Sequence, residues 1–220
     1  MSTVLTHSES FHADDVVVLD TMAGYRGFFA LDTLHLKHRR FAGGWSEVFT
    51  RELFLRDPAA GVLLYDPDLD QVVLVEQFRV GALPAAQQNG SSPWLLELVA
   101  GIIAPGESAE ELARREAVEE AGCKILALEH IVDYYNSPGG SNEWISLYCG
   151  RIDARGAGGI FGLEEEHEDI RVHVLSFEDA WQALKAGRMN NAMAIIALQW
   201  LWMNRDSLRQ RWQQNGIAAT

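Results

Sequence analysis

The chain has 220 residues, of which 48% are hydrophobic and 22% charged, and its formal net charge is −13. This composition is typical of a folded protein, and the length suits one domain or a domain with a smaller partner. The acidic balance disfavours nonspecific binding to nucleic acid, which depends on a basic surface. The longest apolar run, Ala192 to Met203, is interrupted by Gln199 and is too short for a membrane span. We therefore expect no nucleic-acid partner and no membrane association.

Two cysteines, Cys123 and Cys149, each lie inside an apolar segment. Two buried thiols suit a reducing compartment. The polar stretch MSTVLTHSESFHADD at the start of the sequence has no apolar region typical of a secretory leader. We therefore expect a cytoplasmic location.

Three strand-like runs open the chain, at 15–20, 28–37 and 46–54, with a turn signal at Ala42-Gly43-Gly44. They predict a small antiparallel sheet. We assign residues 1–57 to this N-terminal β region and residues 58–220 to the main domain.

The main domain opens with a predicted hairpin around Asp66-Pro67-Asp68, and residues 82–93 are predicted to form a loop. Its apolar runs predict strands at 61–65, 71–78, 94–100, 126–135, 144–152 and 170–175. The run at 94–100 is nearly all apolar, which is typical of a strand buried on both faces. Helices are predicted at 108–121, 177–186 and 191–213. Strands with few helices between them indicate an α+β fold in which helices pack on a mixed sheet.

The helix predicted at 108–121 carries three carboxylates on one face. Glu116, Glu119 and Glu120 stand at i, i+3 and i+4, and a stripe of alanines every four residues lies beside them. Small side chains allow a close approach to a neighbouring element, so these acids should lie near protein rather than in bulk water. Oxygen ligands at this density suit Mg²⁺ or Mn²⁺. The alternative is a solvated acidic helix face.

The residues around the three acids favour the metal interpretation. Gly101, Glu107, Arg115-Glu116, Glu119-Glu120 and Gly122 match the Nudix box, Gx5Ex7REUxEExGU, at every fixed position. Ser108 with Glu111 fits a capping box, and Gly122 fits a helix terminator. So many fixed positions at fixed spacings are not expected by chance.

The chain resembles the bacterial ADP-ribose pyrophosphatase family of Nudix hydrolases over most of its length. Beyond the box, the resembling stretches are YRGFFALD at 25–32, VEQFR at 75–79, WLLELVAG at 94–101, SPGGSNE at 137–143 and HEDIRVHVLS at 167–176. A proline roughly fifteen residues after the box, here Pro138, is the mark of ADP-ribose specificity in this family. The resemblance implies a Nudix fold, an α/β/α sandwich, and hydrolysis of ADP-ribose to AMP and ribose 5-phosphate.

The resemblance also implies a metal site and a catalytic base. Glu116 and Glu120 would ligate Mg²⁺, Glu119 would support or share this role, and the Ala100 carbonyl would add an oxygen. Position matching makes Glu166 the base and Glu168 a further metal ligand. Two or three Mg²⁺ ions are expected, with Mn²⁺ as the alternative metal. A solvated acidic loop is the competing interpretation of 162–169.

Substrate contacts follow from the same resemblance. Family members are homodimers with swapped N-terminal strands, so Phe28, Phe29, Arg51 and Glu52 would bind the substrate of the other subunit. The remaining candidates on the substrate are Arg56, Arg79, Ile102, Ser137, Pro138, Gly139 and Glu143. Core packing is the alternative for the two phenylalanines, and a surface ion pair is the alternative for the arginines.

Two other functions stay open. The same chemistry could act on another nucleoside diphosphate sugar or on a dinucleotide. A noncatalytic ADP-ribose sensor would have a degraded box and an appended DNA-binding segment, whereas this box is intact and no basic recognition helix follows it. The lack of a Ser or Cys nucleophile arrangement fits phosphoryl transfer, which needs mainly positioning and charge neutralisation.

Overall fold

The computed structural model describes residues 11–163 and 167–217, with side chains described as far as Trp212. The chain divides into two compact units. The N-terminal unit comprises Met1–Asp57 and Ser137–Glu143, and the main unit comprises Pro58–Asn136 and Trp144–Thr220. The predicted site residues are therefore shared between two units, which are described separately below.

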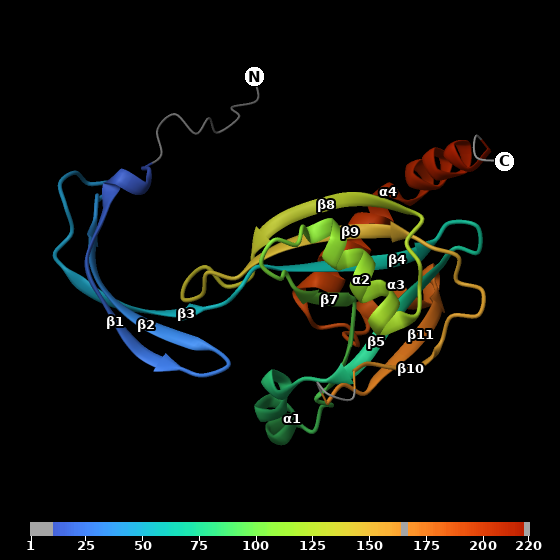
Figure 1. Cartoon of the computed structure of the whole chain (residues 1–220), viewed down its shortest axis with the longest axis horizontal. Helices are drawn as coiled ribbons and strands as arrows, with labels where there is room; N and C mark the ends of the chain where they lie inside the picture. The colour runs from blue at the N-terminus through green and yellow to red at the C-terminus, as the bar shows by residue number, and fades with distance from the viewer. Residues whose placement is uncertain (1–10, 164–166, 218–220) are drawn as a thin grey trace. The chain divides into compact units, whose positions relative to one another are not determined.

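The N-terminal unit is a three-stranded antiparallel sheet, drawn in blue in Figure 1. Its strands are β1 (Val16–Arg26), β2 (Ala30–His38) and β3 (Phe49–Leu55), in the order β1-β2-β3, and a short 3₁₀ helix (Ala13–Asp15) precedes them. The predicted antiparallel sheet is confirmed. β1 runs six residues past the predicted end at 20, because its pairing with β2 continues to the close of the hairpin, where Arg26 faces Ala30.

The main unit is built on a mixed sheet in the order β10-β11-β5-β4-β9-β8. The strands are β4 (Ala59–Asp66), β5 (Gln71–Phe78), β6 (Trp94–Glu97), β7 (Val99–Ile102), β8 (Ala127–Tyr135), β9 (Trp144–Arg151), β10 (Gly159–Phe161) and β11 (Ile170–Ser176). β4 and β9 are parallel, and the other pairs are antiparallel. The predicted hairpin is β4–β5, and its turn is fixed by the Asp66 carboxylate, which accepts the Asp68 and Leu69 amides at 2.9 and 3.0 Å.

Helices cover both faces of this sheet (Figure 1). Helix α2 (Ala109–Ala121) packs on one face, and α3 (Phe177–Lys185) and α4 (Ala192–Ile217) pack on the other. Successive strand residues point to opposite faces, so along β5 the side chains of Val73 and Val75 join the core below α2, whereas Val72 and Leu74 join the core below α3 and α4. The predicted α+β sandwich with a mixed sheet is confirmed.

Three details of the prediction are wrong. Residues 82–93 are not only a loop, because they contain α1 (Leu83–Asn89) after a 3₁₀ turn (Val80–Ala82), with a proline in the first turn and Gly90 at the end. The strand predicted at 94–100 is two strands that part at Leu98, where β6 pairs with β5 and β7 pairs with β4. The short strand β10 was missed. Apolar content alone does not show with which strand each part of an apolar run will pair.

Cys123 and Cys149 are both buried and free, as predicted. Burial raises the pKa of each thiol, which makes thiolate formation unfavourable. Of the helices in the described residues, none combines the length and apolarity needed to cross a membrane.

Candidate active site

The box helix α2 begins and ends where the sequence predicted. The Ser108 hydroxyl accepts the Glu111 amide at 3.2 Å, and the Glu111 carboxylate accepts the Ser108 amide at 2.9 Å, which completes the capping box. Gly122 ends the helix in the left-handed region with φ +62°, where a side chain would be strained. The ends of the helix are therefore fixed, and so is the face that carries its glutamates.

The three glutamates are buried to different depths. Glu120 is only 3% exposed, the Glu116 side chain is 15% exposed and the Glu119 side chain is 35% exposed. The Glu120 carboxylate accepts the amide of Ala100 at 3.1 Å, which ties the helix to β7. At the adjacent Gly101, an added Cβ would lie 2.7 Å from Glu116 Cδ, so a side chain there would displace the Glu116 carboxylate from its position. The first glycine of the box thus makes room for a carboxylate.

Burial makes the ionised forms of Glu116 and Glu120 unfavourable. Desolvation is the main reason that the pKa of Glu120 is raised to about 8; the charges of Glu116 and Glu168 add to the rise, and the Ala100 amide and Arg79 oppose it. Desolvation also raises the pKa of Glu116, where Arg115 opposes the shift. Glu120 would be fully ionised at neutral pH only with additional positive charge nearby.

Arg115 forms ion pairs with three of the glutamates of the box. Its guanidinium group lies 3.0 Å from Glu107 Oε1, and 2.8 Å from both Glu116 Oε1 and Glu119 Oε2. The hydrogen bond from Arg115 is the main reason that the pKa of Glu107 is lowered. The invariant arginine and first glutamate of the box pattern therefore orient Glu116 and Glu119.

A further acid, Glu168, lies in the loop before β11 and interacts electrostatically with Glu116 and Glu120. The Glu168 amide donates to the Leu163 carbonyl at 3.2 Å, and the Leu163 amide donates to Glu168 Oε2 at 3.2 Å, so the two ends of the loop are joined. The negative charge of Glu168 raises the pKa of both Glu116 and Glu120. Glu166, the predicted base, lies outside the described residues.

These residues fit a divalent cation. Glu116, Glu120 and the Ala100 backbone come together at the contact of α2 with β7, and they offer only hard oxygen ligands. Within the described residues, no three His, Cys, Asp or Glu side chains are already assembled as a metal site. Burial is the main reason that the pKa values of Glu120 and Glu116 are raised, and neighbouring acids add to it, so a bound cation would favour the ionised forms of both groups.

Arg79 lies beside a cleft in the main unit. Its Nε atom is 2.6 Å from Glu97 Oε2, so the ion-pair alternative considered for Arg79 holds in the free protein. The cleft has a volume of about 160 Å³, and Arg79, Glu97, Ala100 and Asn191 are among its lining residues. Asn191 caps α4 by accepting the Ala194 amide at 3.0 Å, and it donates to the Leu96 carbonyl at 3.0 Å.

In the N-terminal unit, several predicted substrate residues form one aromatic and charged cluster. Phe28 is 86% exposed and packs edge-to-face on Phe29 at 4.8 Å. The Arg56 guanidinium lies 4.5 Å above the Phe29 ring and 3.0 Å from Glu143 Oε1. Phe54 packs against Phe29 at 5.1 Å. Core packing does not account for Phe28, because most of its ring faces solvent.

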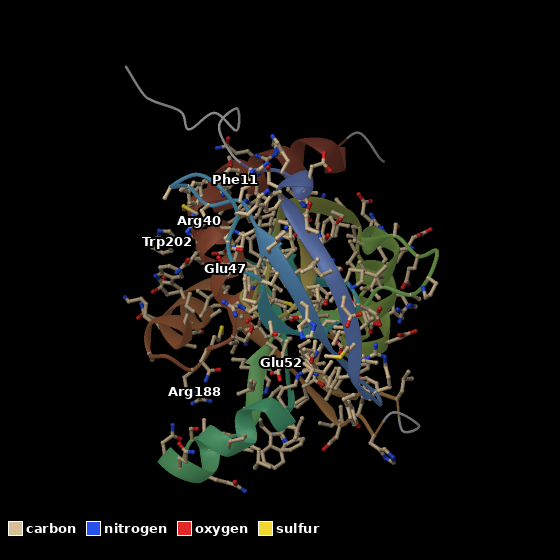
Figure 2. All side chains as sticks on the ribbon, turned by 90° about the vertical axis from the view of Figure 1, so that its left-hand side faces the viewer. Phe11, Arg40, Glu47, Glu52, Arg188 and Trp202 are labelled. Atoms are coloured by element: carbon tan, nitrogen blue, oxygen red, sulfur yellow. The ribbon has the colours of Figure 1, made fainter. Side chains whose placement is uncertain are left out.

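The other predicted contacts lie apart from this cluster. Arg51 donates a hydrogen bond to the Thr50 carbonyl at 2.8 Å and lies 4.6 Å over the ring of Phe49. Glu52, labelled in Figure 2, is exposed, and strand alternation places it on the other face of β3. Ser137, Pro138 and Gly139 are exposed at a turn in which the Ser141 amide donates to the Ser137 carbonyl at 2.9 Å. This turn belongs to the N-terminal unit, where the Gly140 carbonyl accepts the Phe54 amide at 2.8 Å. In the main unit, Ile102 is 41% exposed.

Sequence reasoning missed Glu97, Asn191 and Phe54 as members of these clusters. Glu97 had a usable signal, because a lone acid in the apolar run WLLELVAG requires a partner when the strand is buried. Asn191 was interpreted only as a helix cap, and its position beside Arg79 depends on the packing of α4. Phe54 gave no signal beyond strand alternation.

Comparison with known proteins agrees with the geometry of α2 and β7. The NUDIX domain model matches residues 55–197, which is more than half of the chain. The chain therefore belongs to the Nudix family, and the resemblance read from the box is confirmed.

Among curated relatives, an ADP-ribose pyrophosphatase of Haemophilus influenzae is 44% identical over 96% of this chain and 97% of its own length. An ADP-ribose pyrophosphatase of Escherichia coli is 45% identical over 92% of this chain and 95% of its own. A GDP-mannose pyrophosphatase of Cronobacter sakazakii is 34% identical over 69% of this chain and 76% of its own. A crystal structure of an ADP compounds hydrolase matches with a TM-score of 0.64 at 20% identity, covering 89% of this chain and 98% of that one, which supports the fold.

The raised pKa of Glu120 predicts how the metal-free protein responds to pH. Burial keeps a proton on Glu120 in the folded protein up to a pH of about 8, whereas the pKa of this carboxyl in the unfolded chain is the ordinary 4.5. This group therefore stabilises the fold below about pH 4.5, and its contribution is lost as the pH rises to about 8. Glu120→Gln has no carboxylate to ionise, so this loss of stability should be absent. In EDTA, the free energy of unfolding of the variant relative to the wild type should therefore increase between these pH values. The increase should be a few kcal/mol, at about 1.4 kcal/mol per pKa unit.

Urea unfolding at a series of pH values measures this difference. Glu119→Gln on the exposed side of the same turn is the matched control. Parallel pH profiles for the wild type and Glu120→Gln would show that Glu120 is not desolvated.

Proposed function

We propose that the protein hydrolyses the diphosphate of ADP-ribose to AMP and ribose 5-phosphate with the help of divalent cations. The observation that carries this proposal is the approach of the buried Glu120 and the partly buried Glu116 to Ala100 and Gly101, an arrangement of carboxylates suited to divalent cations. The choice of substrate rests on the relatives that are 44 and 45% identical over almost the whole chain.

Mg²⁺ is the proposed metal, with two or three ions and Mn²⁺ as an alternative. Glu116, Glu120 and the Ala100 carbonyl would hold it, with Glu119 and Glu168 as additional ligands. Bound cations would neutralise the diphosphate and make the attacking water more acidic. Arg115 would keep the carboxylates oriented as they turn toward the metal, and burial of Glu120 excludes water from the base of the site.

Glu166 is the proposed general base, which would accept the proton of the attacking water. Its neighbour Glu168 is held by the hydrogen bonds to Leu163 and exerts a negative potential on Glu120. These contacts support an assignment of the 162–169 loop to the site rather than to a solvated surface. A positioned base is worth about 10² to 10⁴ in rate.

Arg79 is the proposed diphosphate contact in the main unit. An arginine fork matches phosphate oxygens, and Arg79 lines the cleft together with Ala100 and with its ion-pair partner Glu97. Ile102 would contact the substrate beside it.

The N-terminal unit would bind the adenosine part of the substrate of a partner subunit. The exposed ring of Phe28 offers a stacking surface for a base, supported from below by Phe29, while Arg51 and Glu52 would add polar contacts. Arg56 with Glu143, and the turn at Ser137, Pro138 and Gly139, would contact the remainder.

We further propose that the protein is a homodimer in which the N-terminal strands reach the partner. In the described part of this unit, residues 11–57 and 137–143, no residue is fully buried, so the sheet has no core of its own. On β1, Val16, Val18, Leu19 and Met22 are 44 to 54% exposed. A second copy would cover this apolar surface.

Purified protein should release AMP from ADP-ribose only when a divalent cation is present. A panel of ADP-ribose, GDP-mannose and a dinucleotide, each with Mg²⁺, with Mn²⁺ and with EDTA, followed by chromatography of the products, measures this. ADP-ribose should give the highest kcat/KM. Preference for GDP-mannose, the substrate in the name of the relative that is 34% identical, would contradict the choice of substrate. Binding without turnover would favour a sensor.

Glu166→Gln should lower kcat by about 10² to 10⁴ while Mg²⁺ titration is nearly unchanged, because it removes the base and no ligand. Glu164→Gln and Glu165→Gln, its neighbours in the same acidic run, are the controls and should retain most of the activity. A comparable loss in either control but not in Glu166→Gln would move the base to that position.

Val18→Asp should convert the dimer to monomers, because it places a charge on the apolar surface of β1. Light scattering after size-exclusion chromatography measures the mass. Leu69→Asp, at an equally exposed leucine in the β4–β5 turn (46% exposed), is the control and should remain dimeric. A monomeric wild type would refute the proposed dimer.

A further inference from the structure

Gln77 is a buried polar residue that the proposed function does not yet use. It lies near the end of β5, it is 6% exposed, and its side-chain Nε2 atom has no hydrogen-bond partner in the described residues. A buried amide N–H without a partner is destabilising, and native proteins contain few of them. An unpartnered donor of this kind suggests that its acceptor arrives with a ligand.

The sheet alternation fixes the face on which Gln77 lies. Val73 and Val75 join the core below α2, so Gln77, two residues further on, points to the same face as the box helix. On β6, Leu95 is opposite Gln77 and Glu97 is opposite Val75. The next residue of this series along the chain is Arg79, which pairs with Glu97 at 2.6 Å.

β11, the strand on the other side of β5, leads to the acid Glu168. β11 is antiparallel to β5 and has Arg171 opposite Glu76, so the next position of the register brings Ile170 beside Gln77. Glu168 is two residues before Ile170 in the chain. Arg79 and Glu97 line the same cleft as Ala100, whose amide donates to Glu120. Gln77 is therefore flanked on one side by the strand that leads to Glu168 and on the other by the strand that carries Glu97.

We infer that Gln77 is a substrate-binding residue whose Nε2 donates a hydrogen bond to an oxygen of the bound diphosphate. This inference rests on the proposed function. An amide suits the position because it adds a donor to a phosphate oxygen without adding charge among the carboxylates, and hydrogen bonds to charged acceptors are the stronger ones. In the free protein the same donor is a cost to folding, as expected where function and stability oppose each other.

Gln77→Met keeps the length of the side chain and removes the donor. With Mg²⁺ present, calorimetry should show binding of the α,β-methylene analogue of ADP-ribose weakened by roughly 10- to 100-fold, the range for a hydrogen bond to a charged group. Binding of Mg²⁺ alone should be unchanged. In EDTA, the melting temperature should rise by about 2 to 4 °C, because the unpartnered amide is gone.

Gln71→Met is the matched control, on the same strand and face but at the other end, opposite Asp66. It should change neither the binding of the analogue nor that of Mg²⁺. Unchanged binding of the analogue by Gln77→Met would overturn the inference, and so would weaker binding of Mg²⁺ alone, because the donor would then serve a metal ligand. A lower melting temperature in EDTA would show a structural role. Failure of the proposed function is separate, because the wild type would then release no AMP from ADP-ribose.

Discussion

The buried carboxylate of Glu120 is the constraint on which the rest of the site depends. It lies against β7 at 3% exposure, where its only described backbone donor is the Ala100 amide. Burying a charge without a partner is costly, so a protein either protonates the group or supplies a cation. The raised pKa is the first response, and a divalent ion would be the second. Gly101 belongs to the same site, because a side chain there would take the place of the Glu116 carboxylate.

The mixed sheet holds this arrangement in place by separating its two cores. Below α2 the core is made largely of small and β-branched residues, such as Val75, Ala113 and Ala117, which let the helix lie close to the strands. The opposite core contains larger side chains, among them Phe177 and Trp212, and supports α3 and α4. The division at Leu98 then turns β7 toward β4, which brings Ala100 to the box helix and leaves Glu97 beside Arg79.

The sequence predicted the parts of the fold that depend on local chemistry. The capping of α2 by Ser108, its end at Gly122 and the two-residue alternation of β5 follow from short-range rules, and all are present. The division of a single apolar run at Leu98 was not predictable, because it depends on which strand pairs with each half. Likewise, the spacing of the acids was read from the box, whereas the depth of Glu120 and the unpartnered amide of Gln77 arise from tertiary packing.

The distribution of positive charge explains why cations would be needed for an anionic substrate. The chain carries 18 lysines and arginines against 31 acids, and the two arginines described beside the carboxylates of the main unit, Arg79 and Arg115, already have carboxylate partners. Arg79 is paired with Glu97, and Arg115 with Glu107, Glu116 and Glu119. Moving either arginine to a phosphate would leave a carboxylate without its partner, so these side chains redistribute charge but add none. A bound divalent cation would add the positive charge that a diphosphate requires, and the oxygens of Glu116 and Glu120 are the groups suited to hold it.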